Sequence, residues 1–204
     1  VVFTNNDSAY QTAIDLYEKG IKVQAIIDVR SKGKGSLTQK AESLGLKIYN
    51  NHAVTNTSGR LKIKNLTINQ IDDSIKKIIG PPLTIDCDLL CVSGGWTPTV
   101  HLFTQSRGKL IYREKDGTFI PHKSFQDCLS IGACNGTFAL NEILNETFAK
   151  ISSIFMDFNI KSSITQKYKS ESSTIGHLKH AWLIPSSQHI GKTKMFVDFQ
   201  NDVT

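Results

Sequence analysis

CDLLCVSGGWTP (residues 87–98) and CLSIGACNG (residues 128–136) are the two segments that decide the fold expected for this chain. Each predicts a short buried strand, at residues 89–92 and 128–131, that runs into small residues. Glycines at a strand end let another backbone or a ligand come close. Ligands of open α/β sheets bind beyond the carboxyl ends of the strands. We therefore expect the two strand ends to form one wall of a nucleotide site.

The first 28 residues predict a strand–helix–strand unit, which implies a parallel sheet. The expected segments are a strand at 1–4, a helix at 9–19 with Ala9, Ala13, Leu16 and Tyr17 on its apolar face, a helix end at Gly20, and a strand at 23–28. This is the layout of a dinucleotide-binding half, but its phosphate-binding glycines are missing. Asn5, Asn6 and Asp7 stand in that turn, and the Asp7 carboxylate would repel a phosphate. We expect this unit to have lost its ligand. Asp28 is left open as a ribose-binding acid or as a turn residue.

The rest of the chain predicts an α/β fold with a β-meander. Up to residue 82, the expected elements are a glycine loop at 31–36 without a P-loop ending, a helix at 37–44, strands at 46–49, 53–55 and 60–68 with a turn at 56–59, a helix or strand at 71–79, and a break at 80–82. After the segment 87–98, we expect a helix or turn at 100–105, a hairpin of 108–112 and 118–121, and, after the strand at 128–131, a helix at 137–150. In the strand at 60–68, Leu61 and Ile63 are expected to face inward and the lysines to face water.

Composition is that of a soluble globular protein, with 204 residues, 39% hydrophobic residues and a net charge of +6. The lysines are spread along the chain rather than gathered in a block, so we expect no nucleic-acid partner. The four cysteines have no metal-ligand spacing and indicate small buried side chains in a reducing cytoplasm. His177 and His180 have no third ligand nearby, so no metal site is expected. There is no stretch that could span a membrane and no signal peptide.

The two ends indicate an internal piece of a longer polypeptide. Val1 is already inside a predicted strand, and residues 196–204 look like an element that is beginning.

Three segments carry a family resemblance. The order of elements resembles flavoproteins with two dinucleotide-binding domains, the disulfide-reductase-like class. FTNNDSAYQTAIDLYEKGIKVQAIIDVR, CDLLCVSGGWTPTVHLFTQSRGKL and MFVDFQNDVT resemble the alpha subunits of heterotetrameric sarcosine oxidases over essentially the whole chain.

The resemblance implies a place in a complex with beta, gamma and delta subunits. Such a complex oxidises the small molecule sarcosine to glycine, transfers the one-carbon unit to tetrahydrofolate and reduces oxygen to hydrogen peroxide. It also implies NAD at a partial site in this chain, FAD and FMN on or against the beta subunit, and tetrahydrofolate on a C-terminal part outside this chain. Alternatives are a subunit of an FAD-dependent amine or opine dehydrogenase, and a scaffold that has lost cofactor binding. No catalytic constellation is present, so we expect the isolated chain to be inactive.

The resemblance also implies a set of cofactor-binding residues, namely Gly132, Ala133, Gly136, Phe138 and Leu140. Ala133 stands where flavin-binding relatives have an Asp that holds the linker of FAD, which favours NAD over tightly bound FAD. The two glycines would let the backbone approach, and the N-terminus of the helix from Thr137 would favour an anion. The alternative is that the two glycines only permit close packing between helix and strand; given the resemblance, we favour the site.

Three domains follow from the resemblance: an inserted NAD-type Rossmann-like domain at 1–82, the C-terminal part of the FAD/NAD-binding domain at 83–150, and an incomplete small ferredoxin-like domain at 151–204. Asp198 and Gln200 replace the cysteines that such a domain uses for an iron–sulfur cluster, so no cluster is expected.

Overall fold

The computed structural model describes residues 1–33, 35–160, 170 and 178–186. The described chain forms two compact units. Unit 1 contains residues 1–95 together with 178–186, and unit 2 contains the described residues from Trp96 to Ser170. Each unit is described by itself.

Unit 1 is built on a four-stranded parallel sheet. Its elements are β1 (Val2–Thr4), α1 (Ser8–Glu18), β2 (Ile26–Asp28), α2 (Ser36–Ser43), β3 (Ile48–Asn50) and β7 (Cys91–Ser93), and the strand order is β3-β2-β1-β7. The predicted strand–helix–strand unit and its parallel pairing are confirmed. The chain winds from β1 through β2 to β3 on one side, and β7 lies on the other side of β1. The place just outside the carboxyl ends of the neighbouring strands β1 and β7 is therefore a topological switch point, where open α/β sheets bind ligands.

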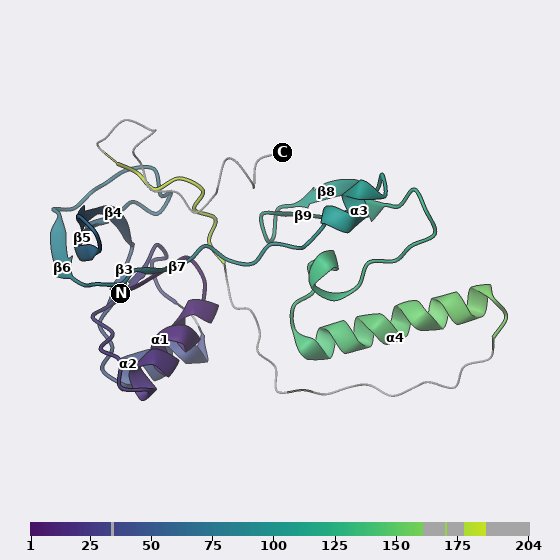
Figure 1. Ribbon diagram of the computed structural model, residues 1–204, viewed down its shortest axis with the longest axis horizontal. Coiled ribbons are helices and arrows are strands. Elements are labelled where there is room, and N and C mark those ends of the chain that lie inside the picture. Colours follow the sequence, from purple (N-terminus) through teal and green to yellow (C-terminus); the bar gives the residue numbers. More distant parts are fainter. Residues whose placement is uncertain (34, 161–169, 171–177, 187–204) are drawn as a thin grey trace. The chain divides into compact units, whose positions relative to one another are not determined.

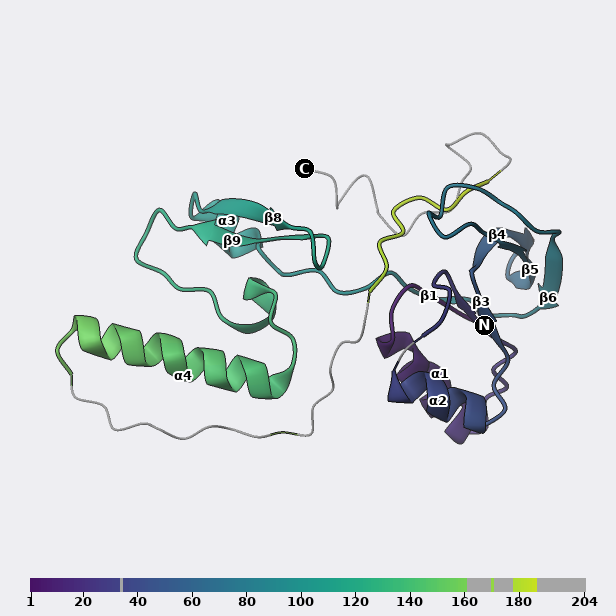
Figure 2. The same ribbon diagram turned by 180° about the vertical axis from the view of Figure 1, so that it is seen from behind.

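Each face of this sheet is covered by a different layer. Helices α1 and α2 lie side by side on one face (Figures 1 and 2), where Tyr10 and Ile14 are fully buried. The other face packs against an antiparallel meander of β4 (His52–Gly59), β5 (Ile63–Gln70) and β6 (Leu83–Asp86). Ala181 and Ile184 are buried in the same core cluster as the meander, so residues 178–186 belong to the core of unit 1.

Several predictions for unit 1 need correction. The hairpin turn lies at residues 60–62, not 56–59, because β4 pairs with β5 as far as Gly59 opposite Ile63. Leu61 is at the tip of this hairpin and is 98% exposed, so it does not face inward. The strand expected at 23–28 begins only at Ile26. Residues 71–79, left open between helix and strand, are mostly turns with one antiparallel bridge from Ile71 to Ile78.

Three predictions of burial were also wrong. Tyr17 is 43% exposed, and Tyr10 and Ile14 take the buried positions of α1 instead. The run at 89–92 is not buried, since Leu89 is 60% exposed and β7 is the edge strand of the sheet. Nor are the cysteines buried, because Cys128 is exposed and the other three are half-buried.

Unit 2 contains one hairpin, two α-helices and a short 3-10 helix. Its elements are α3 (His101–Gln105), β8 (Lys109–Arg113), β9 (Thr118–Lys123), the 3-10 helix η1 (Gly132–Asn135) and α4 (Leu140–Asp157). The predicted hairpin is confirmed, and Gly117 in its turn has a φ of 63°. The prediction of a strand at 128–131 is wrong: this segment pairs with no strand of the described chain. Helix α4 begins at Leu140 instead of Thr137 and continues past Lys150 to Asp157.

The predicted α/β fold with a parallel sheet and antiparallel strands is confirmed. The compact units divide the chain at Gly95 and Trp96, β6 continues the meander beyond residue 82, and α4 crosses residue 150. The assignment of 1–82, 83–150 and 151–204 to three family domains stays a prediction. His177, Asp198 and Gln200 lie outside the described residues.

None of the helices in the described chain is long and apolar enough to cross a membrane. Within residues 1–33, 35–160, 170 and 178–186, no group of three or more His, Cys, Asp and Glu side chains could hold a metal ion.

Candidate functional site

The switch point between β1 and β7 is crossed by side chains of the chain itself. The Asn5 amide donates a hydrogen bond of 2.9 Å to the carbonyl oxygen of Gly94. The Asn6 amide donates to Oγ of Ser93 at 3.1 Å and to Oδ1 of Asn5 at 2.9 Å. Both asparagines are buried. These bonds join the carboxyl ends of the two strands where a ligand of an open α/β sheet would enter.

Behind this turn lies a buried ion cluster at the carboxyl ends of β1 and β2. The Arg30 guanidinium contacts Oδ1 of Asp7 at 2.6 Å and Oδ2 of Asp28 at 2.7 Å. The Tyr10 hydroxyl donates a hydrogen bond of 2.8 Å to Asp28. Arg30 is 3% exposed and Asp28 is 0% exposed. The cluster therefore holds its charges away from water, which is tolerated only with close pairing.

The Asp28 carboxylate is already bonded to groups of the protein and is not available to bind a ribose. It accepts hydrogen bonds from the backbone N–H of Arg30, from Nε and Nη2 of the same side chain, and from Tyr10. Of the two alternatives that the sequence left open for Asp28, the structure favours a turn residue, and adds an ion pair. Sequence reasoning missed Arg30 and Tyr10. The Asp-x-Arg spacing at the end of a predicted strand was the available signal.

Burial and charge shift the pKa values of this cluster in definite directions. Burial, together with the Asp28 carboxylate, raises the pKa of Tyr10 well above its ordinary value, so the hydroxyl stays protonated. Burial disfavours the charged form of Arg30, but hydrogen bonds and attraction from Asp28, then from Asp7, raise its pKa above its ordinary value. The cluster contains fixed partners rather than a group that is prepared for proton transfer.

Residues 178–186 add a further cover at the same edge. The backbone N–H of Lys179 donates a hydrogen bond of 3.0 Å to the carbonyl oxygen of Asn5. Gly95 has a φ of 114°, and a Cβ at this position would lie 2.8 Å from Cδ1 of Leu178. The glycine at the end of β7 thus lets Leu178 come close, which is the role that the sequence suggested for a ligand.

The predicted cofactor-binding residues of unit 2 lie along one short turn. Gly132 and Gly136 have φ values of 70° and 75°. A Cβ on Gly136 would lie 2.5 Å from Nη2 of Arg113, and one on Gly132 would lie 3.4 Å from Cγ2 of Ile143. Nη2 of Arg113 also donates a hydrogen bond of 2.9 Å to the carbonyl oxygen of Gly136. Close packing therefore requires a glycine at position 136, while a Cβ on Gly132 would make only an ordinary contact with Ile143.

The other three predicted residues differ in exposure. Ala133 is exposed on η1, and Leu140 is exposed at the start of α4. Phe138 is half-buried, with its ring 6.2 Å from that of Trp96. The anion expected near Thr137 has a counterpart within the protein, because the carboxylate of Glu146 accepts a hydrogen bond of 3.1 Å from the backbone N–H of Gly132. Sequence reasoning missed Glu146, which looks like an ordinary surface residue of an amphipathic helix.

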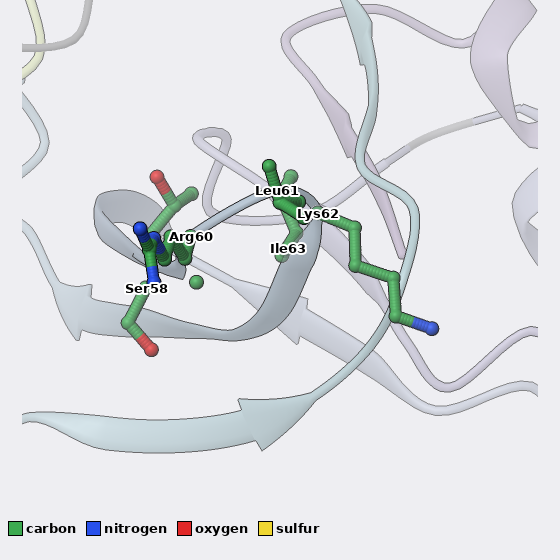
Figure 3. Close-up of a pocket in the computed structure, with 7 residues that line it drawn as sticks. Ser58, Arg60, Leu61, Lys62 and Ile63 are labelled. Carbon is green, nitrogen blue, oxygen red and sulfur yellow. The ribbon is translucent and has the colours of Figure 1, made fainter.

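A shallow hollow of about 260 Å³ lies at the β4–β5 hairpin and is lined by residues 57–63. Figure 3 shows the Lys62 side chain extending away from the other labelled residues. Gly59 is required in this loop, since a Cβ would lie 1.9 Å from the carbonyl oxygen of Lys62. The hollow is formed by one turn, and no Asp, Glu, His or Cys is among its lining residues.

Known proteins match this chain along its whole length. The chain is 28% identical over 207 residues to the sarcosine oxidase subunit alpha of Corynebacterium sp. (strain P-1), and 28% identical over 209 residues to that of Rhizobium meliloti (strain 1021). The chain is similar to sarcosine oxidase alpha subunits. The matches cover 100% and 99% of this chain, but only 21% and 19% of the relatives, so the chain spans about a fifth of their length. No protein-family model matches the chain.

Solved structures support the fold. Bacillithiol disulfide reductase from Staphylococcus aureus has a TM-score of 0.56 at 15% identity, covering 76% of this chain and 50% of that one. Thioredoxin reductase from T. acidophilum has a TM-score of 0.51 at 14% identity, covering 78% of this chain and 52% of that one. The fold is that of disulfide-reductase-like proteins, as the order of elements predicted.

Proposed function

We propose that this chain is part of the alpha subunit of an oxidoreductase complex that oxidises sarcosine. The observation that carries the proposal is the similarity to sarcosine oxidase alpha subunits over the whole chain. In the proposed reaction, sarcosine and water give glycine and formaldehyde, and oxygen accepts two electrons and two protons to form hydrogen peroxide. Tetrahydrofolate takes up the formaldehyde. FAD and FMN on or against a beta subunit carry the electrons, and gamma and delta subunits complete the complex.

Unit 1 contributes a scaffold to this complex rather than a nucleotide site. The Asn5 and Asn6 bonds across the switch point support this role, because they close the place where a pyrophosphate would enter. The buried cluster at the same edge contains two carboxylates and one guanidinium, so its formal net charge is negative. A net negative charge beside a ligand phosphate would repel it.

Unit 2 contributes one side of a dinucleotide site. Gly132, Ala133, Gly136, Phe138 and Leu140 are the residues we assign to it. The exposure of Ala133 and Leu140 supports this, since both are open to a ligand. The methyl group of Ala133 offers no acceptor to the hydroxylated linker of a flavin, so NAD is the proposed occupant. The residues present fit a nucleoside or ribose contact better than a phosphate contact, because Glu146 already takes the Gly132 N–H group.

The test uses the complete natural polypeptide that carries this sequence, affinity-tagged in its source and purified with its partners. We expect hydrogen peroxide to be released when sarcosine and oxygen are added, and NAD to be found by mass spectrometry after denaturation. The isolated 204-residue chain serves as a control and should give no peroxide. A purified complex without sarcosine-dependent peroxide would overturn the proposal. Oxidation of a different amine without oxygen as acceptor would favour an amine or opine dehydrogenase.

A further inference from the structure

The segment between the hairpin and α4 is held by two side chains of α4. Glu146 accepts hydrogen bonds from the backbone N–H of Gly132 at 3.1 Å and from Nδ2 of Asn135 at 2.5 Å. Lys150, one helical turn further on, donates to the carbonyl oxygen of Ser130 and contacts Oε1 of Glu146 at 3.1 Å. We call this pair the Glu146–Lys150 clamp. It supplies the donor and acceptors that a neighbouring strand would have supplied to residues 130–135.

This clamp is more than an exposed ion pair between positions i and i+4. The Glu146 side chain is 16% exposed, and its partners come from both the turn and the helix. Such a pair on an open helix surface contributes only about 0.3–0.5 kcal/mol. A carboxylate that accepts several hydrogen bonds in a partly buried place fixes the groups around it more strongly.

Desolvation of Glu146 would raise the pKa of its carboxyl group, but hydrogen bonds from Gly132, Lys150, Asn135 and Thr137 outweigh it and lower the pKa below the ordinary value. Nearby charged groups are Lys150 on the same helix and Arg113 of β8, which reaches the carbonyl oxygen of Gly136. Glu146 is therefore ionised at neutral pH.

Resting on the proposed dinucleotide site, we propose that Glu146 is its positioning residue: the clamp holds the Gly132–Gly136 turn so that Ala133, Phe138 and Leu140 face the nucleotide. Gly132 and Gly136, at the two ends of the turn, have a left-handed backbone conformation. Because glycine has no Cβ, many other backbone conformations are also open to this segment. The clamp selects one of them. Because Glu146 fills the Gly132 N–H, the turn contacts ribose hydroxyls of the nucleotide and not its phosphates.

The test compares Glu146→Ala, Glu146→Gln and the control Glu142→Gln in the complete natural polypeptide. Glu142 is an exposed acid one helical turn earlier on the same helix, so the control removes the same charge and leaves the Glu146–Lys150 clamp in place. We expect Glu146→Ala to weaken NAD binding at least tenfold in calorimetric titration, Glu146→Gln to weaken it less, and Glu142→Gln to leave it unchanged. The free energy of unfolding of each variant is measured in parallel.

The pH dependence of NAD affinity distinguishes a positioning role of Glu146 from a role in stability alone. The wild-type affinity should be constant around neutral pH and fall only in acid, below the pH at which an ordinary glutamate takes up its proton, since the lowered pKa keeps Glu146 ionised until then. The affinity of Glu146→Gln should show no such fall. Equal profiles, or equal NAD affinities of wild type and Glu146→Ala, would overturn the role of Glu146 and leave the proposed dinucleotide site intact.

A second measurement distinguishes the two proposals. Hydrogen exchange of the Gly132 amide should speed up at least tenfold in Glu146→Ala and stay unchanged in Glu142→Gln. If wild type and every variant fail to bind NAD, the dinucleotide site is wrong and the positioning role falls with it. If NAD binds and Gly132 exchange is the same in Glu146→Ala, only the clamp is wrong.

Discussion

Arg30 is a cation placed between two carboxylates in a region that water does not reach. The Coulomb attraction inside such a cluster is offset by the cost of removing three charges from water. The cluster is for this reason a poor source of net stability, but it is sensitive to the loss of one member. Removing the cation would leave Asp7 and Asp28 buried without a partner of opposite charge.

We predict that Arg30→Ala lowers the free energy of unfolding of unit 1 by about 3–5 kcal/mol. The measurement is hydrogen exchange of the β1 and β2 amides under native conditions, which reports on this unit by itself. Lys40→Ala is the control, because Lys40 pairs with Glu18 at 2.9 Å on the surface. Its loss should cost less than about 1 kcal/mol. A similar cost for both variants would contradict the prediction.

A comparison of Gly136 with Gly20 separates two costs of adding a side chain: the cost of the left-handed backbone conformation and the cost of a clash with neighbouring atoms. Both have φ values near 75–79°, but a Cβ at Gly20 would meet open space, while one at Gly136 would strike Nη2 of Arg113. Gly20→Ala should cost about 1 kcal/mol for the left-handed conformation alone. Gly136→Ala should cost at least about 1 kcal/mol more, because Arg113 must also give up its bond to the Gly136 carbonyl. Hydrogen exchange near each site measures the two costs, and equal values would count against the crowding.

At the scale of an element, the β4–β5 hairpin has a strand that packs in the core and a tip that is exposed to solvent. Leu66 lies in β5 and is 0% exposed, in contact with the core between the parallel sheet and the meander. Leu61, five positions earlier, lies in the tip. Alternation along the strand is broken by the turn, so the two leucines have opposite environments.

We predict that Leu66→Ala lowers the stability of unit 1 by about 3 kcal/mol, through lost burial and the cavity that remains. Leu61→Ala should change it by less than about 0.5 kcal/mol, because this side chain buries no surface in the chain. Denaturant unfolding followed by hydrogen exchange of β5 amides compares the matched pair. A cost for Leu61→Ala as large as that for Leu66→Ala would show that the tip is packed in solution.

At the scale of the whole molecule, unit 1 is completed by residues far away in the sequence. Ala181 and Ile184 join the core cluster formed by β1, β2 and the meander, more than 80 residues after β7. The chain thus returns to unit 1 after unit 2. The fold of unit 1 depends on this return, since a core with two side chains removed would hold a cavity.

Ile184→Ala should lower the stability of unit 1 by about 2–4 kcal/mol and leave unit 2 unchanged. Hydrogen exchange of the β4 and β5 amides should become faster, while exchange of α4 amides stays as in wild type. Leu183→Ala is the control, because Leu183 is 37% exposed. Unchanged β5 exchange in Ile184→Ala would contradict the role of residues 178–186 in this core.

The sequence by itself determined the parallel strand–helix–strand unit, the hairpin of unit 2 and the α/β class, because these depend on periodicity and turn residues that act over a few positions. Only the tertiary structure decided the roles of Arg30, Glu146 and residues 178–186. Arg30 and Glu146 each have one partner close in the sequence, but their other partners, Asp7 and Gly132, lie outside their own elements, as does the core that residues 178–186 join. Their burial and these longer-range bonds follow from packing rather than from spacing. The prediction of a strand at 128–131 was wrong for the same reason. Its apolar residues favour a strand, but side chains of α4, and not a neighbouring strand, bond to the backbone of Ser130 and Gly132.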